Sequence, residues 1–140
     1  MDEELICWCV LATRAACVRM TARHLKALQD SVGQACLPAR FGWDRRACAH
    51  AQIVNLLADV TAEHPVPAMV LTQVAGTLYD LMVAAGPAAD GMIKSSRRRL
   101  LGLIRAGDAD GAAAEMEHHL RALRFMARLV GPAEPGGIAV

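Results

Sequence analysis

The sequence predicts one all-α domain, an antiparallel bundle of about six helices. Apolar residues make up 54% of its 140 residues and aromatic residues only 4%, so Ala, Leu, Val and Met must build the core. Ala and Leu are strong helix formers. The apolar residues recur at helical spacing, and no stretch alternates as a half-buried strand does. Short connections between the helices favour antiparallel neighbours.

The first two predicted helices meet near Thr21. The first runs from about Asp2 to Met20, and its acidic first turn suits the positive end of the helix dipole. Its apolar stripe contains Leu5, Cys9, Ala12, Ala16 and Met20, extended by Trp8, Leu11 and Ala15. Thr21 is a good N-cap for the second helix, which ends near Cys36. That helix buries Leu25, Leu28 and Val32.

The third and fourth predicted helices are separated by two prolines. Asp44 is the expected N-cap of the third helix, which runs to about Glu63. Its stripe contains Cys48, Ile53, Leu56, Leu57 and Val60. The His64-Pro65 pair breaks the helix, because a residue before proline is disfavoured in the helical region. Pro65 and Pro67 fit the first turn of the fourth helix, which ends near Ala85.

Glycine marks both ends of the fifth predicted helix. A connection over 86–91 leads into this helix, which covers roughly Met92 to Ala106. Gly107-Asp108 ends it, and Asp108 caps a sixth helix that runs to Val130. Residues 131–140 contain two Pro and three Gly, so we expect a flexible tail. The predicted division is therefore a helical domain over 1–130 and a tail over 131–140.

Composition also limits the environment and the partners. The formal net charge is +1, so no overall field favours nucleic acid. The five cysteines form no CxxC pair and are odd in number, which favours reduced thiols in a cytoplasmic protein. The acidic start is unlike a secretory signal, and no apolar stretch is long enough to span a membrane. We therefore expect cytoplasmic localisation without membrane association.

From about residue 5 to residue 130 the chain resembles the FCD domain. This is the all-helical effector-binding half of FadR-type regulators in the GntR superfamily. The resemblance rests on the cap Thr21, the His64-Pro65 break, the Gly107-Asp108 junction, and His119 eleven residues after Asp108. In the family, an Asp and three His bind a divalent cation that holds a carboxylate effector.

Counting from these landmarks places Ala51, Asn55, Arg97 and His119 at the four ligand positions. Only His119 is a competent metal ligand there, since Asn binds transition metals poorly and Arg would repel a cation. We therefore expect no metal and no cofactor. A different alignment with the family would place His50 at one of the ligand positions.

The resemblance implies an effector site formed by Asn55, Arg97 and His119, in a cavity between the third, fifth and sixth helices. An inward guanidinium at Arg97 offers a planar fork for a carboxylate in place of the metal. The alternative is that Arg97, Arg98 and Arg99 form a solvated face, because three successive residues spread over most of a turn.

Polar residues of the sixth predicted helix have ordinary structural explanations as well. His118 and His119 cannot share one face, so one is expected to face inward, and Glu115 lies four residues before His119, where it could orient the ring. Arg121 and Arg124 recur along one side and are expected to form a solvated face rather than a nucleic-acid surface.

Two function classes follow. The first is a ligand-sensing regulatory domain of a GntR/FadR-type transcriptional regulator that binds a small anionic effector. It would be homodimeric, and it would contact DNA only through a winged-helix domain that this chain lacks. The alternative is a structural dimerisation or interaction module with a degenerate ligand pocket. We do not expect an enzyme, because the sequence shows no paired carboxylates, nucleophile elbow or phosphate loop.

Overall fold

In a computed structural model, the described residues are 1–36, 42–61 and 68–130. They form six α-helices and a short 3-10 turn, which are α1 (Glu3–Arg19), α2 (Ala22–Ala35), α3 (Trp43–Val60), α4 (Ala68–Ala85), η1 (Pro87–Ala89), α5 (Asp90–Arg105) and α6 (Ala109–Val130). The all-α prediction is confirmed, with no strand in these ranges. The predicted break at 64–65, the prolines at 65 and 67 and the tail over 131–140 lie outside the described residues.

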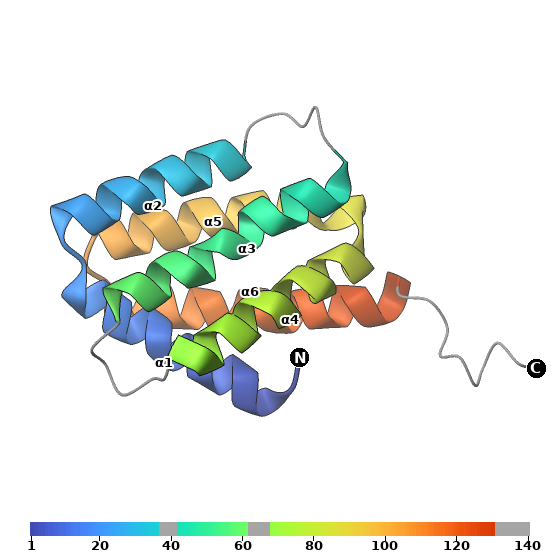
Figure 1. The fold of residues 1–140 in the computed structure, drawn as a ribbon, viewed down its shortest axis with the longest axis horizontal. Coiled ribbons are helices and arrows are strands. Elements are labelled where there is room, and N and C mark those ends of the chain that lie inside the picture. Colours follow the sequence, from blue (N-terminus) through green and yellow to red (C-terminus); the bar gives the residue numbers. More distant parts are fainter. Residues whose placement is uncertain (37–41, 62–67, 131–140) are drawn as a thin grey trace, which may run out of the picture.

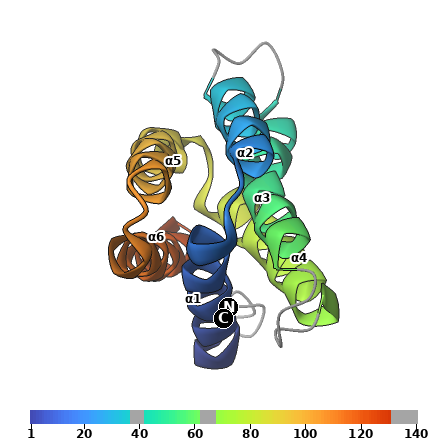
Figure 2. The same ribbon diagram turned by 90° about the vertical axis from the view of Figure 1, so that its left-hand side faces the viewer.

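Successive helices run back and forth along the long axis of the molecule (Figure 1). Helices α2, α3 and α4 lie side by side on one side of the bundle, and α5 and α6 lie on the other (Figure 2). Helix α1 packs against α6 and also contacts α3 and α4. The middle of α3, α5 and α6 therefore faces the interior of the bundle.

Side-chain caps fix the starts of α1 and α2, whereas the start of α3 differs from the prediction. The Asp2 carboxylate accepts a hydrogen bond from the Leu5 amide at 2.9 Å, and the Thr21 hydroxyl accepts one from the His24 amide at 3.2 Å. Thr21 is therefore the N-cap of α2, as the sequence predicts. The prediction for Asp44 is wrong, because the N-cap of α3 is Gly42, two residues earlier, and the helix begins at Trp43. Asp44 instead lies in the first turn, where its charge suits the helix dipole.

The Gly107-Asp108 junction joins α5 to α6 as predicted. Gly107 has φ of +73°, and its amide donates to the Ile104 carbonyl at 3.0 Å while the Asp108 amide donates to Leu103 at 2.9 Å. These two bonds are a Schellman motif, which requires the left-handed conformation that glycine adopts easily. The Asp108 carboxylate then accepts from the Gly111 amide at 2.9 Å and caps α6. At its other end, α5 starts at Asp90, two residues before the predicted Met92, because η1 runs directly into it.

Most of the predicted apolar stripes are buried, with two corrections. Leu5, Cys9, Ala12 and Ala16 of α1 lie in the core, but Leu11, predicted on the same stripe, is 42% exposed. Cys48 on α3 is exposed, whereas Ala47 beside it is fully buried. Among the described helices, none combines the length and the apolar character needed to cross a membrane.

The arginines of α6 tie that helix to the start of the chain. Arg121 and Arg124 both donate to the Glu3 carboxylate, at 2.8 and 3.1 Å. Hydrogen bonds from Arg121 and then Arg124 lower the pKa of Glu3 to about 2. These two cations therefore have intramolecular partners at the α1–α6 contact.

Candidate functional site: a central polar cluster

Arg97 is buried in the middle of the bundle. Helix α5 directs Ile93, Arg97, Leu100 and Ile104 inward at helical spacing, and Arg97 is only 1% exposed. Its neighbours Arg98 and Arg99 are both exposed. One of the three successive arginines therefore enters the core, and the other two form the solvated face that the alternative interpretation describes.

The Arg97 guanidinium is only partly hydrogen bonded. Its Nη2 donates to the backbone carbonyl of His50 at 3.2 Å, while Nε and Nη1 have no partner among the described residues. Burial lowers the pKa of Arg97 to about 10, which still leaves the group protonated at neutral pH. Arg97 is thus a permanent buried charge with two unused donors.

Two buried histidines accompany Arg97, and we call Arg97, His50 and His119 the central polar cluster. Each histidine is 1% exposed. Both ring nitrogens of His119 and Nδ1 of His50 lack a partner among the described residues. Burial and then the charge of Arg97 lower the pKa of His50 to about 4, and the same two causes hold the pKa of His119 well below its ordinary value. Both rings are therefore neutral at neutral pH, and Arg97 alone charges the cluster.

Asp90 connects the cluster to the surface. Its carboxylate lies 3.4 Å from Nε2 of His50 and forms ion pairs with Arg46 at 2.7 Å and Lys94 at 3.1 Å. Burial raises the pKa of Asp90, but the hydrogen bond from Lys94 and the charge of Arg46 outweigh this and hold it below its ordinary value. Its negative charge is therefore already balanced by two cations, and it orients the His50 ring.

Glu115 is also engaged outside the cluster. Its carboxylate pairs with Arg99 and lies 3.4 Å from the Ser96 hydroxyl. The prediction that Glu115 orients His119 is therefore wrong, since neither nitrogen of that ring has a partner in the part of the chain that the structure describes. His118 is exposed while His119 is buried, as expected for adjacent residues of one helix. With Asp90 and Glu115 both paired elsewhere, no described carboxylate forms an ion pair with Arg97.

Cys9 of α1 lies fully buried within electrostatic reach of Arg97. Burial raises the pKa of this thiol to about 12, even though the charge of Arg97 and a contact with Thr13 oppose the shift. The thiol therefore stays protonated and serves as a small packing group.

Asn55 does not join the other two predicted site residues. It is exposed on α3, where its amide donates to the Gln52 side chain at 2.9 Å. Arg97 and His119 are both buried in the cluster, and His50 supplies the contact from α3. The sequence feature that indicates burial of His50 is its helical spacing. It lies three residues after Ala47 and four before Val54, and both of these residues are buried.

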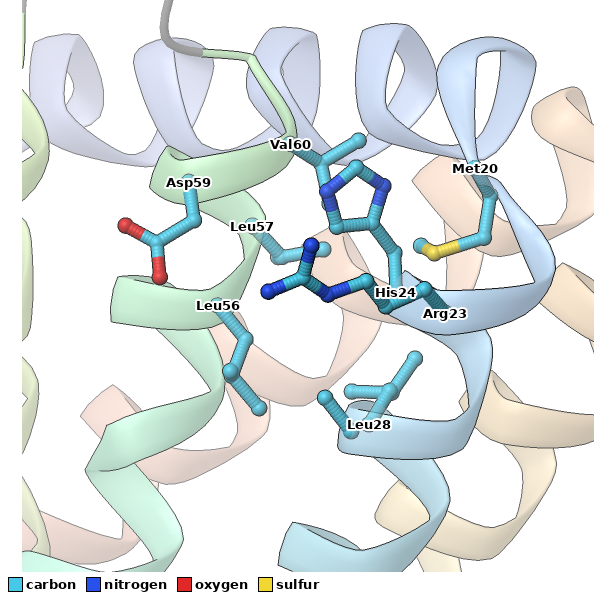
Figure 3. Close-up of a pocket in the computed structure, with 9 residues that line it drawn as sticks. Met20, Arg23, His24, Leu28, Leu56, Leu57, Asp59 and Val60 are labelled. Carbon is cyan, nitrogen blue, oxygen red and sulfur yellow. The ribbon is translucent and has the colours of Figure 1, made fainter.

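The described residues contain no group of three or more His, Cys, Asp or Glu side chains placed to hold a metal ion. A cavity between α3, α5 and α6 was expected beside His119. A pocket of about 370 Å³ lies between α2 and α3 (Figure 3), and two smaller hollows lie along α1. Asn55, Arg97 and His119 line none of these three. The cluster is thus a compact polar centre surrounded by core side chains.

No family model, no curated protein and no solved structure matches the chain. The resemblance to the FCD domain therefore stays a prediction, and functional inference rests on the geometry of the fold.

Proposed function

We propose that the bundle is a ligand-sensing domain that binds a small anion at the central polar cluster. The observation that carries the proposal is Arg97, a buried cation that has two unpartnered nitrogens and no paired carboxylate among the described residues. A buried charge is costly unless it is paired and hydrogen bonded. A bound anion supplies both the opposite charge and the missing acceptors.

The electrostatics of the cluster favour an anion with a single charge. Arg97 contributes one positive charge, while His50 and His119 are neutral at neutral pH. A neutral imidazole offers one donor and one acceptor, so His119 can donate to a carboxylate oxygen through one ring nitrogen. Burial of all three side chains favours a compact ligand, such as a short-chain carboxylate.

Such a ligand would bind three helices at once. Arg97 belongs to α5, His50 to α3 and His119 to α6, so the anion would link the two sides of the bundle. A ligand that binds only the folded arrangement stabilises it. In a FadR-type regulator, which the FCD resemblance implies, this change would be passed to a DNA-binding winged helix elsewhere in the regulator.

Thermal unfolding tests the proposal, with the singly charged acetate, propionate, lactate and pyruvate as probes. At least one carboxylate should raise the melting temperature of the wild-type protein, and Arg97→Met should abolish that rise. Arg98→Met is the matched control, because Arg98 is an exposed neighbour on the same helix. The proposal fails if none of the four acts, or if Arg97→Met keeps the full response.

A second candidate function is dimerisation through α1. Glu4, Cys7, Leu11, Ala15 and Val18 recur at spacings of three and four along one side of the helix. Leu11 is 42% and Val18 is 75% exposed, although the opposite side of α1 is fully buried in the core. Shallow hollows of about 280 and 300 Å³ lie beside this stripe. A helix that is apolar on both sides favours burial of both.

We propose a second copy of the chain as the partner of this stripe, in an antiparallel two-fold pairing centred on Leu11. Glu4 lies at one end of the stripe and Arg19 flanks the other, so antiparallel pairing brings opposite charges together. It also sets Cys7 opposite Ala15 of the partner subunit. Sedimentation should give a dimer that Leu11→Asp converts to a monomer. Ala15→Cys should form a disulfide with Cys7 of the partner subunit, whereas wild-type protein that cross-links through Cys7 alone contradicts the antiparallel arrangement.

A further inference from the structure

We propose that the α2–α3 pocket is a separate binding site for a small zwitterion with an apolar body, such as an apolar amino acid. Its lining residues are Met20, Arg23, His24, Ala27, Leu28, Leu56, Leu57, Asp59 and Val60. The proposal is independent of the central polar cluster, because no residue of that cluster lines this pocket.

The floor of the pocket is apolar and belongs to the hydrophobic core. Leu28 of α2 and Leu57 of α3 are each 1% exposed and belong to the hydrophobic core, and Met20, Leu56 and Val60 pack partly buried against it. The volume of about 370 Å³ is at the lower end of the range for small-molecule sites. The pocket thus suits a ligand with a short aliphatic or aromatic side chain.

The α2 side of the pocket is electropositive. Arg23 and His24 occupy the first turn of α2, where the helix dipole also places a partial positive charge. The Thr21 hydroxyl oxygen accepts from the His24 amide at 3.2 Å and lies 2.9 Å from the Nδ1 of the His24 ring. When the hydroxyl hydrogen is donated to Nδ1, Nε2 carries the ring proton and is a donor. This side of the pocket therefore fits a carboxylate.

The α3 side of the pocket carries negative charge. Asp59 lies in the last turn of α3, at the negative end of that helix dipole. Figure 3 shows the Arg23 guanidinium extending from α2 toward α3, with Asp59 on the far side of the pocket. The described residues supply no ion pair to either Arg23 or Asp59. This side of the pocket therefore fits an ammonium group.

The two charged sides over one apolar floor distinguish a zwitterion from simpler ligands. A lone carboxylate that pairs with Arg23 also faces Asp59, and a lone amine that pairs with Asp59 also faces Arg23. A zwitterion pairs with both, while its side chain covers the leucines of the floor. Because both charges are solvent-exposed, each contact is weak and screened, so we expect millimolar affinity.

The test uses L-leucine and three analogues as probes, with chemical-shift changes of backbone amides as the readout. The analogues are 4-methylpentanoate, which lacks the amine, 3-methylbutylamine, which lacks the carboxylate, and glycine, which lacks the side chain. We expect saturable shifts at Arg23, Ala27 and Val60 with leucine, and at least a fivefold weaker response with each analogue.

Variants locate the ligand. Arg23→Gln and Asp59→Asn should each weaken leucine binding at least fivefold, whereas Arg98→Gln and Asp80→Asn, at exposed sites outside the pocket, should not. Arg97→Met should also keep the response, which separates this site from the central polar cluster. The proposal is overturned if leucine causes no saturable shifts, if an analogue binds as well as leucine, or if binding survives both pocket variants.

Discussion

The central polar cluster and the α2–α3 pocket differ in the solvent exposure of their charged groups. In the cluster, Arg97, His50 and His119 are each 1% exposed, and five of their nitrogen atoms lack a partner among the described residues. In the pocket, Arg23 and Asp59 are exposed at the rim, above a floor formed by core leucines. One region has a buried charge enclosed by core side chains, and the other has an open pocket with solvated charges at its rim.

This difference separates the effects that ligands and substitutions have in the two regions. Coulombic interactions strengthen as water is removed, so charge and protonation dominate in the cluster. At the pocket rim, water and salt screen the same kinds of charges, so apolar contact supplies most of the binding energy. Changes to the cluster should therefore alter stability strongly, and changes to the rim should alter ligand binding with little effect on stability.

The largest expected effect follows replacement of the buried cation. Arg97→Met keeps a long side chain but removes the charge, so it should raise the free energy of unfolding by about 1–4 kcal/mol without ligand. Urea denaturation measures this change, with Arg98→Met as the exposed control. A marked loss of stability would mean that the guanidinium already has a counter-charge within the fold, and the contrast between the two regions would disappear.

Acid should destabilise the fold through the buried histidines. Their folded pKa values lie below the ordinary 6.5, so the unfolded chain binds more protons as the pH falls from 6.5 toward about 4. Stability is therefore complete above this window and should decrease within it by roughly 1 kcal/mol per pH unit for each histidine. Unfolding measured at neutral pH and at about pH 5 tests this. His119→Leu should reduce the pH dependence, and an unchanged slope would contradict the neutral state of His119.

A smaller effect is expected where the cluster reaches the surface. Asp90→Asn keeps the size of the side chain but leaves Arg46 and Lys94 without their shared carboxylate, whose side chain is 17% exposed. We expect a loss of about 1 kcal/mol in the free energy of unfolding. Asp80→Asn, at an exposed site on α4, is the control. Equal stability of both variants would show that Asp90 does not hold His50 in place.

The smallest effects are expected at the pocket rim. Arg23→Gln and Asp59→Asn should each change the free energy of unfolding by no more than about 0.5 kcal/mol, because both side chains are exposed and neither forms an ion pair with another described residue. Thermal melts without ligand measure this directly. A large loss in either variant would mean that the rim is part of the packing, and the two regions would then be more alike than their exposure indicates.

Two of the three predicted site residues, Arg97 and His119, lie together in the structure, and the third, Asn55, lies apart from them. Arg97 and His119 were placed by counting from Asp108, within two helices joined by a defined Schellman junction, so their register was secure. Asn55 was counted back from the His64-Pro65 pair, and a shift of the count moves the residue to another face of α3. His50 lies on the buried side of α3 with Ala47. Alanine is a weak marker of burial, so the sequence pattern indicates the neighbouring face, which carries Cys48.

The sequence by itself determined the helical class, the caps at Thr21 and Asp108, and the turn at Gly107. These features depend on interactions within a few residues, which local sequence specifies. Tertiary structure alone decided that Arg97 is buried beside His50 with no ion pair to a described carboxylate, and that α2 and α3 leave a pocket between them. Those outcomes depend on how helices distant in sequence pack together, and residue spacing within one helix carries no information about its neighbours.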